Sequence, residues 1–178
     1  MAVDEERISK FLSMILRHKP EAIGLELDAS GWADVQTLLD KANAGGHALS
    51  RDAVEQVVAN SDKKRFVFSD DGQRIRANQG HSITVDLGLA AIPPPALLFH
   101  GTATRFLAAI RSTGLTPQSR QSVHLSASVD VALSVGKRHG TPVVLTVHAQ
   151  KMHAAGHPFY LSANGVWLTA AVPPQFLE

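Results

Sequence analysis

The sequence predicts an α+β protein built from two lobes, and three observations carry that prediction. At 178 residues the chain fits one domain or two small lobes. Apolar residues recur with helical spacing through the first third of the chain, whereas prolines and short apolar strands replace that spacing from about residue 81. The composition, 44% hydrophobic and 19% charged, is that of packed globular cores. We expect one lobe over residues 1–80 and a second over residues 81–178.

Three short helices and a hairpin are expected in the first lobe. Apolar side chains spaced i, i+3, i+4, i+7 and i+8 predict a helix over residues 8–16. Two more helices are expected over residues 34–43 and from the capping residue Ser50 onward. Residues 65–69 and 73–77 predict two strands around a tight turn. This order of elements is the pattern of a winged helix, a fold that often binds nucleic acid, but the order alone discriminates poorly.

Strands alternate with helices in the second lobe. LLFHGT and TPVVLTVHA predict buried strands, SVHLS a short strand, and FYLSANGVWLTA a hairpin that turns at Asn164-Gly165. Helices are expected in SVDVALSVGKRHG and in ATRFLAAIRSTG, the latter with Phe106, Leu107 and Ile110 facing inward. The pattern is typical of a compact lobe with a mostly antiparallel sheet.

The composition excludes several classes of protein. Cysteine is absent, so the chain has no disulfide framework, no thiol nucleophile and no thiolate metal site. The start, MAVDEERISK, is acidic and polar, which is unlike a signal peptide. The longest apolar stretch, residues 87–99, is interrupted by one glycine and three prolines and cannot span a bilayer. We expect a cytoplasmic protein with no membrane partner, and nothing in the sequence demands more than a monomer.

Charge is divided unequally between the lobes. Residues 1–80 hold eleven Lys/Arg and thirteen Asp/Glu, whereas residues 81–178 hold six Lys/Arg and three Asp/Glu. Those three acids, Asp86, Asp130 and Glu178, are too few for a glycosidase-type carboxylate pair or a magnesium or calcium site. A site in the second lobe must therefore use histidines, arginines, hydroxyls and backbone amides.

Basic motifs in the first lobe have an ordinary and a functional interpretation. Arg17-His18, in RHKP, suits the last turn of a helix, where positive charge complements the helix dipole. Arginine also binds phosphate oxygens through two parallel donors. Arg65, in KKRF, suits a solvated edge strand as well as an anion site. The segment RIRANQGHS, residues 74–82, is more polar than a connector requires, and we favour a role as the wall of a cleft.

Histidines stand at two strand ends of the second lobe. Residues 100–102, His-Gly-Thr, end an apolar strand, where the histidine is either packed in the core or part of a site that a nucleotide approaches. Arg120 and residues 124–126, His-Leu-Ser, place a second imidazole at another strand edge. Three further histidines lack supporting carboxylates or cysteines, so no metal site is expected. They are His148, His153 and His157.

In order along the chain, seven motifs resemble those of the RNA 2′-phosphotransferase family, Tpt1/KptA, over roughly residues 7–172. They are RHKP, KKRF, RIRANQGHS, FHGT, SRQSVHLS, VGKRHG and NGVWL. The resemblance implies a winged-helix lobe followed by a lobe with the ADP-ribosyltransferase fold. It implies that an internal RNA 2′-phosphate displaces nicotinamide from NAD and that the ribose 2″-hydroxyl then attacks phosphorus. The products would be nicotinamide, RNA with a 2′-hydroxyl and ADP-ribose 1″,2″-cyclic phosphate.

The resemblance also implies roles for individual residues. Three arginines would hold the 2′-phosphate, while a histidine handles a proton or hydrogen-bonds the departing ribose oxygen. This catalytic set is Arg17, His18, Arg65 and Arg120. The NAD-binding set is His100, Gly101, Thr102, His124, Leu125, Ser126, Gly136, Arg138 and Val166, of which Arg138 also fits a position toward RNA. Secondary RNA contacts would be Lys19, Lys64, Arg74 and Arg76.

Two other functions fit parts of this pattern. An NAD-dependent ADP-ribosyltransferase that modifies terminal phosphates of nucleic acids would stop after the first step, but the full Arg-His-Arg-Arg set favours both steps. A winged-helix regulator with a ligand-sensing second lobe would need no phosphate-binding set. The shortage of carboxylates also favours phosphate transfer, because an anionic acceptor needs positioning and charge screening rather than a general base.

Overall fold

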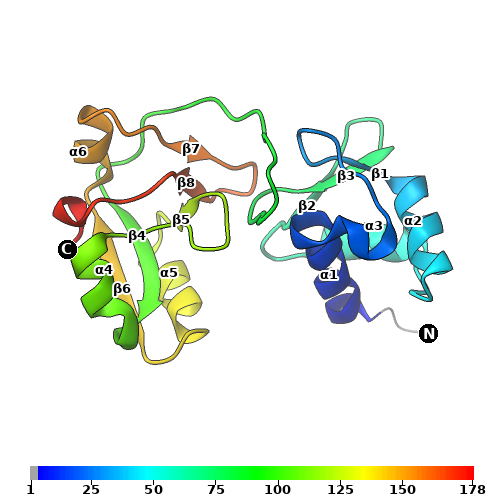
Figure 1. Cartoon of the computed structure of the whole chain (residues 1–178), viewed down its shortest axis with the longest axis horizontal. Coiled ribbons are helices and arrows are strands. Elements are labelled where there is room, and N and C mark those ends of the chain that lie inside the picture. Colours follow the sequence, from blue (N-terminus) through cyan, green and yellow to red (C-terminus); the bar gives the residue numbers. More distant parts are fainter. Residues whose placement is uncertain (1–3) are drawn as a thin grey trace. The chain divides into compact units, whose positions relative to one another are not determined.

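The chain folds into two compact units, Met1–Gly88 and Leu89–Glu178, in a computed structural model that describes residues 4–178 (Figure 1). The sequence places the boundary eight residues earlier, at residue 80. Residues 81–88 pack with the first unit because the Ser82 amide donates to the Arg17 carbonyl at 3.0 Å, and the Asp86 amide donates to the Ala29 carbonyl at 2.8 Å.

Three helices cover one side of the first unit (Figure 1). They are α1 (Glu5–Ser13), α2 (Val35–Ala44) and α3 (Arg51–Asn60). The side chains of Asp34 and Ser50 accept hydrogen bonds from the first-turn amides of α2 and α3, which fixes where these helices begin. Their inward faces bury the residues that the helical spacing predicted, including Leu12, Leu38 and Val54. The three predicted helices are therefore confirmed.

A three-stranded antiparallel sheet completes this unit. Its strands are β1 (Ala33–Asp34), β2 (Phe66–Phe68) and β3 (Arg74–Ala77), in the order β1-β3-β2. The β2–β3 hairpin confirms the prediction. Strand β1 was not predicted, because two residues are too few to show the alternation of a strand.

The first helix does not end as an α-helix. It continues into η1 (Met14–His18), a π-helical turn in which the Lys19 amide donates to the Met14 carbonyl five residues earlier, at 2.7 Å. A single such turn inside a longer helix is uncommon and often lies at a functional site. A short 3₁₀ turn, η2 (Pro20–Ile23), follows and ends at Gly24.

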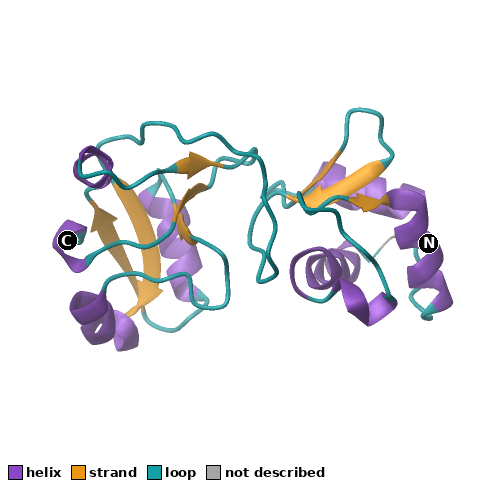
Figure 2. Cartoon of the chain, turned by 45° about the horizontal axis from the view of Figure 1, so that its top comes forward, coloured by secondary structure: helices purple, strands orange, loops and turns teal. Residues whose placement is uncertain are grey.

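The second unit contains two antiparallel sheets, and Figure 2 shows their strands with helices beside them. The first sheet pairs β4 (Leu98–Ala103) with β6 (Pro142–Val147). The second has the order β5-β8-β7, from β5 (Val123–Leu125), β7 (Tyr160–Leu161) and β8 (Trp167–Thr169). A bridge between Phe99 and Ser126 joins the two sheets. The predicted α+β class and antiparallel pairing are confirmed.

Helices of the second unit are α4 (Leu107–Thr113), α5 (Val129–Lys137) and α6 (Ala149–Ala154), with 3₁₀ turns η3 (Thr104–Phe106) and η4 (Pro174–Phe176). Phe106 was expected to face inward, and this was wrong: it is 40% exposed. The reason is that α4 begins only at Leu107, after a 3₁₀ turn, and the Phe106 ring instead contacts the Arg105 guanidinium at 4.6 Å. Helix α6 was not predicted, because six residues carry no period.

Within residues 4–178, no helix combines the length and apolar character that crossing a bilayer requires.

Candidate functional site

The π-helical turn η1 presents Arg17 and His18 at the end of the first helix. Arg17 is half-buried and His18 is exposed. Both basic side chains lie where the helix dipole is negative, which accounts for the ordinary interpretation of RHKP. Arg17 and His18 also contact a segment more than sixty residues away along the chain, and these contacts fix their positions.

Residues 78–83, which we call the strap, lie against this turn. The amides of Ser82 and Ile83 donate to the Arg17 carbonyl at 3.0 and 3.4 Å. The Ser82 hydroxyl lies 2.8 Å from Nδ1 of His18. At Gly80 a Cβ atom would come within 3.1 Å of both Cζ and Nε of Arg17, so the guanidinium is in close contact with bare backbone. The strap therefore fixes the position of Arg17 through its backbone and that of His18 through a hydroxyl.

The same strap also fixes Arg65. The backbone amide of Asn78 donates to the Arg65 carbonyl at 2.9 Å, and the side-chain nitrogen of Asn78 donates to the Lys64 carbonyl at 2.6 Å. Asn78 is only 6% exposed, so these bonds are shielded from water. Lys64 has φ of +50°, a conformation that a non-glycine residue adopts rarely and at a cost. Three predicted catalytic residues, Arg17, His18 and Arg65, are thus held by one six-residue segment.

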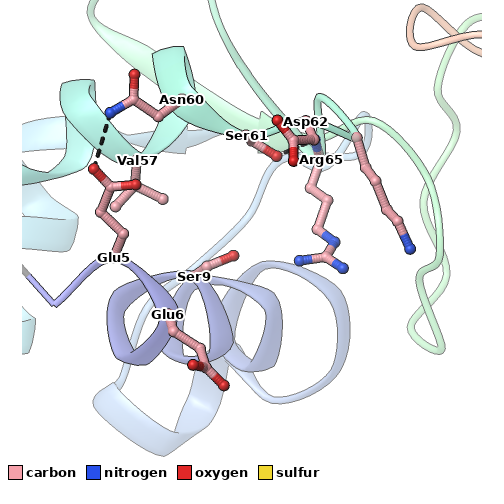
Figure 3. Close-up of a pocket in the computed structure, with 9 residues that line it drawn as sticks. Glu5, Glu6, Ser9, Val57, Asn60, Ser61, Asp62 and Arg65 are labelled. Atoms are coloured by element: carbon pink, nitrogen blue, oxygen red, sulfur yellow. Dashed lines mark hydrogen bonds between the residues drawn. The ribbon is translucent and has the colours of Figure 1, made fainter.

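The side chain of Arg65 extends toward α1 (Figure 3). It lines a cavity of about 240 Å³ between α1 and the end of α3. On the far side of this cavity, Glu5 accepts hydrogen bonds of 2.9 Å from the side-chain amides of Gln56 and Asn60. The Arg65 guanidinium therefore lies at a polar cavity whose lining also includes the carboxylates of Glu5, Glu6 and Asp62.

His81, in the middle of the strap, is almost fully buried at 2% exposure. Burial, together with the positive charges of Arg17, Arg76 and His18, lowers the pKa of His81 to about 4. The ring is therefore neutral at physiological pH. A neutral group at this position adds no charge to the basic cluster around it.

The four predicted RNA contacts have different environments. Lys19 and Lys64 are exposed, as an RNA contact requires. Arg74 is exposed and forms a salt bridge of 3.4 Å with Asp28. Arg76 is half-buried: its Nη1 donates to the Ser30 and Leu87 carbonyls at 3.3 and 3.5 Å, and its guanidinium lies 4.4 Å from the centre of the Trp32 ring. Arg76 therefore connects the loop that contains Ser30 with the segment that contains Leu87.

In the second unit, His100 and His124 lie side by side. Nδ1 of His100 is 3.1 Å from the His124 carbonyl, and Nδ1 of His124 is 3.0 Å from the Ser122 carbonyl. A carbonyl only accepts, so each Nδ1 must carry a proton, and in the neutral form of such a ring Nε2 is an acceptor. Burial and the charge of His139 lower the pKa of His100, which favours this neutral form. The backbone bridge between Phe99 and Ser126 holds the two strands together here, with bonds of 2.7 and 2.8 Å.

Gly101 and Gly136 have a packing role. A Cβ atom on Gly101 would lie 1.6 Å from the Ala132 carbonyl oxygen of α5, and one on Gly136 would lie 2.6 Å from the Thr102 carbonyl oxygen of β4. The two glycines therefore let α5 lie directly on β4. Thr102 and Leu125 are both buried, at 6% and 2% exposure. These four predicted NAD-binding positions shape the strands that carry the histidines.

The remaining predicted residues of this unit lie on loops and element ends. Arg138 is exposed and caps the C-terminal end of α5, next to Lys137. Ser126 follows β5, and its hydroxyl accepts from the Ser128 amide at 3.0 Å. Val166 donates its amide to the Ser162 hydroxyl at 3.0 Å, within the turn of the predicted hairpin. Arg120 is exposed, and its amide donates to the Pro117 carbonyl at 3.0 Å.

Sequence reasoning singled out the segment that contains the strap but assigned no role to Asn78, Gly80 or Ser82. The density of polar residues in RIRANQGHS was the available signal. Their partners lie up to 65 residues away, and no spacing along the chain reveals such contacts. Among residues 4–178, no three histidine, aspartate or glutamate side chains cluster as metal ligands would.

Comparison with known proteins gives a consistent result. Residues 3–171 match the model of a family described as "RNA 2'-phosphotransferase, Tpt1 / KptA family". A protein of Agrobacterium fabrum named "Probable RNA 2'-phosphotransferase" is 62% identical over 169 residues, which cover 95% of this chain and 91% of that protein. Proteins with the same name from Acaryochloris marina and Pseudomonas aeruginosa are 59% and 56% identical, over 95% and 96% of this chain and 93% and 94% of their own lengths.

Proposed function

Because this chain belongs to the RNA 2′-phosphotransferase family, Tpt1/KptA, we propose that it removes an internal 2′-phosphate from RNA and transfers it to NAD. The observation that carries the proposal is the strap. It forms hydrogen bonds to the backbone carbonyls of Arg17 and Arg65 and to the side chain of His18, which supports a common role for these three residues. A set of two arginines and a histidine fits a dianionic phosphate, because guanidinium groups match its oxygens.

In this proposal the arginines act on the phosphate in both steps. Arg17, Arg65 and Arg120 screen the negative charge of the 2′-phosphate as it attacks the C1″ carbon of the NAD ribose. They then stabilise the charge on phosphorus as the ribose 2″-hydroxyl attacks it. His18 donates a proton or a hydrogen bond to the departing 2′-oxygen of the RNA. Nicotinamide, ADP-ribose 1″,2″-cyclic phosphate and RNA with a free 2′-hydroxyl are released.

The residues of the second unit fit NAD. The hydroxyl groups of a ribose are hydrogen-bond donors, and Nε2 of His100 is an acceptor when that ring is neutral. Residues 89–178 hold six Lys/Arg against two Asp/Glu, a balance that suits a pyrophosphate. The two acids are unsuited to act as a general base: Asp130 lies in the first turn of α5, and Glu178 is 2.9 Å from His148. An acceptor that is already an anion needs no such base.

The two lobes are part of the same proposal. Three helices with a small antiparallel sheet support a winged-helix lobe that binds RNA. The two antiparallel sheets of the second unit support a lobe of the ADP-ribosyltransferase type that binds NAD. Lys19, Lys64 and Arg74 are the exposed candidates for secondary RNA contacts. We place the reaction in the cytoplasm, in a monomer, without a metal.

The test is to incubate the full chain with a short RNA that carries one internal 2′-phosphate, with and without NAD, and to weigh the products. Loss of the phosphate only with NAD, together with ADP-ribose cyclic phosphate, is the expected result. An RNA–ADP-ribose adduct that does not turn over would indicate an ADP-ribosyltransferase instead. RNA that binds but never changes would contradict both enzymatic functions.

A variant pair sharpens this test. Arg65→Ala should abolish the second step or the whole reaction, because the phosphate loses one guanidinium. Arg7→Ala is the matched control, since Arg7 is an exposed arginine of α1 whose partner is Asp4, 4.0 Å away. Equal turnover by the two variants would show that Arg65 does not act on the phosphate.

A further inference from the structure

Ser82 has no role in the reaction as proposed above, yet its hydroxyl contacts the histidine of the catalytic set. Its Oγ lies 2.8 Å from Nδ1 of His18, a normal hydrogen-bond length. The two residues are 64 positions apart along the chain. The contact therefore exists only because the fold brings the strap to the end of η1.

The backbone places this hydroxyl, independently of the side chain itself. The amides of Ser82 and Ile83 both donate to the Arg17 carbonyl, one residue before His18. On the preceding side, Gly80 is in close contact with the Arg17 guanidinium, and His81 is buried in the unit at 2% exposure. Removal of the Ser82 hydroxyl would leave every one of these contacts in place. The side chain is exposed, so it contributes little to the core.

A hydroxyl suits a histidine that gains and loses a proton. It can donate to an unprotonated Nδ1 and can accept from a protonated one, so the contact persists in both states of the ring. Because Nδ1 is engaged in either state, chemistry on the RNA falls to Nε2, on the other side of the ring. The two nitrogens of an imidazole are distinguished in this way by the partner of one of them.

We propose that Ser82 is a positioning residue, whose hydroxyl holds the His18 ring through Nδ1 and makes Nε2 the nitrogen that acts on the departing 2′-oxygen of the RNA. The proposal rests on the proposed function. It adds that the orientation of His18 comes from the strap and not from η1 alone. Ser82 itself touches neither RNA nor NAD in this scheme.

The first experiment compares three variants of the full chain on the 2′-phosphorylated RNA. Ser82→Ala should lower kcat about tenfold, the value of one hydrogen bond of ordinary strength, with the KM for NAD unchanged. Ser82→Thr keeps the hydroxyl at an exposed position and should restore most of the rate. Thr84→Ala removes another exposed hydroxyl two residues further along and should have no effect. An unchanged kcat in Ser82→Ala would overturn the proposal.

A double-mutant cycle separates positioning of His18 from a general structural effect. If Ser82 acts through His18, the Ser82→Ala change should cost nothing further in a His18→Ala background. If the tenfold loss persists in that background, Ser82 acts by another route and the proposal is wrong. The comparison requires residual activity, which single-turnover conditions with excess enzyme make measurable.

A readout without substrate keeps the proposal separate from the proposed function. The ¹⁵N shifts of the His18 ring report which nitrogen is hydrogen-bonded, and they should change in Ser82→Ala but not in Thr84→Ala. An unchanged spectrum in Ser82→Ala would overturn the contact whatever the enzyme does. Failure of the wild-type protein to remove the phosphate would count against the proposed function alone, and the spectra would still decide whether Ser82 holds the ring.

Discussion

Gly80 is the single residue on which the position of Arg17 most directly depends. Its φ is +92°, and a Cβ atom there would press on the Arg17 guanidinium at 3.1 Å. Gly88 offers a matched comparison, because its φ is +70° and no atom lies within 4 Å of a Cβ added there. An alanine at either position has the same backbone strain, on the order of 1–2 kcal/mol. Only the first also moves an arginine.

We therefore predict that Gly80→Ala and Gly88→Ala destabilise the first unit to a similar degree but differ in activity. Gly80→Ala should lower kcat about tenfold or more, because a misplaced guanidinium no longer matches the phosphate oxygens. Gly88→Ala should turn over at close to the wild-type rate. The measurement is the rate of 2′-phosphate removal, normalised to the folded fraction. Equal rates would show that the Arg17–Gly80 contact does not matter for catalysis.

His81 gives the first unit a defined dependence of stability on pH. Its pKa is about 4 when folded, against an ordinary value of 6.5, so the unfolded chain takes up a proton first as the pH falls. The contribution of neutral His81 to the free energy of unfolding is therefore fully present above about pH 6.5. It is lost as the pH falls from 6.5 through 4, by up to about 3 kcal/mol. Urea unfolding followed by Trp32 fluorescence in a Trp167→Phe background measures this loss. His81→Gln should flatten the profile in that range, and a profile of unchanged slope would contradict the assignment.

His100 predicts how use of NAD depends on pH. Its ring must be neutral for Nε2 to accept from a ribose hydroxyl, and burial holds its pKa below the ordinary value of 6.5. The KM for NAD should therefore stay constant from alkaline pH down to below 6.5 and rise only at lower pH. Steady-state kinetics over this range test the prediction. A rise in KM that begins above pH 6.5 would mean that His100 is not the group involved.

At the residue scale, the sequence identified the side chains that carry charge but not those that hold them in place. Arg17, His18, Arg65 and the paired histidines stand in recognisable motifs. Gly80 and Ser82 are ordinary residue types, and their importance comes from partners more than sixty residues away. Gly101 shows the converse. The sequence suggested close approach by a nucleotide, whereas the structure shows close approach by α5.

At the element scale, the contact between α5 and β4 determines the architecture of the second unit. Gly101 and Gly136 let the helix lie directly on the strand, and His100 lies in the middle of that strand, next to Gly101. Gly101→Ala would place a Cβ atom 1.6 Å from a carbonyl oxygen of α5, so the helix would have to move. Overpacking typically costs about 1–3 kcal/mol, and a contact this short belongs at the upper end of that range.

We predict that Gly101→Ala lowers the stability of the second unit by about 3 kcal/mol, while Gly156→Ala costs about 1–2 kcal/mol, the backbone strain alone. Gly156 has φ of +100° but no atom within 4 Å of an added Cβ, so it controls for backbone strain. Trp167 lies in β8 and reports on this unit. Denaturation followed by its fluorescence in a Trp32→Phe background is the measurement. Similar midpoints for the two variants would show that α5 adapts to the extra atom.

Elements with a clear period or cap were predictable. Ser50 does cap α3, and the Asn164-Gly165 turn does join β7 to β8. Elements that tertiary contacts create were not. The pair of residues in β1 is a strand only because β3 lies beside it, and the π-helical form of η1, with its bond from Lys19 to Met14, shows in no sequence pattern.

At the scale of the whole molecule, the proposal assigns RNA binding to the first unit and NAD binding to the second. This division can be tested in the intact chain. NAD should protect backbone amides of β4 and β5 from hydrogen exchange, because these strands carry His100 and His124. RNA with a 2′-phosphate should protect the strap and η1, and the same RNA without the phosphate should not. Exchange measured by mass spectrometry on the full protein tests both expectations. Protection of the strap and η1 by NAD alone, or of β4 by the RNA alone, would contradict the division.

The α+β class was predictable for the whole chain because helical spacing and strand runs occupy separate halves. The extent of each unit was harder to predict. Residues 81–88 have no period of their own, and they join the first unit through contacts with Arg17 and Ala29 that only the folded chain displays.

The π-helical turn η1 also determines the direction in which Arg17 and His18 leave the helix axis. Each residue of a regular helix turns the chain by about 100°, so a five-residue bond in place of a four-residue one changes the direction in which every later side chain leaves the axis. If one residue were deleted between Met14 and Leu16, an ordinary α-helical bond could close in its place. Arg17 and His18 would then keep their neighbours in the sequence but be turned by about a quarter of a revolution relative to Gly80 and Ser82. In this chain, the orientation of Arg17 and His18 depends on the number of residues between the start of the helix and the RHKP motif as well as on the residues of the motif itself.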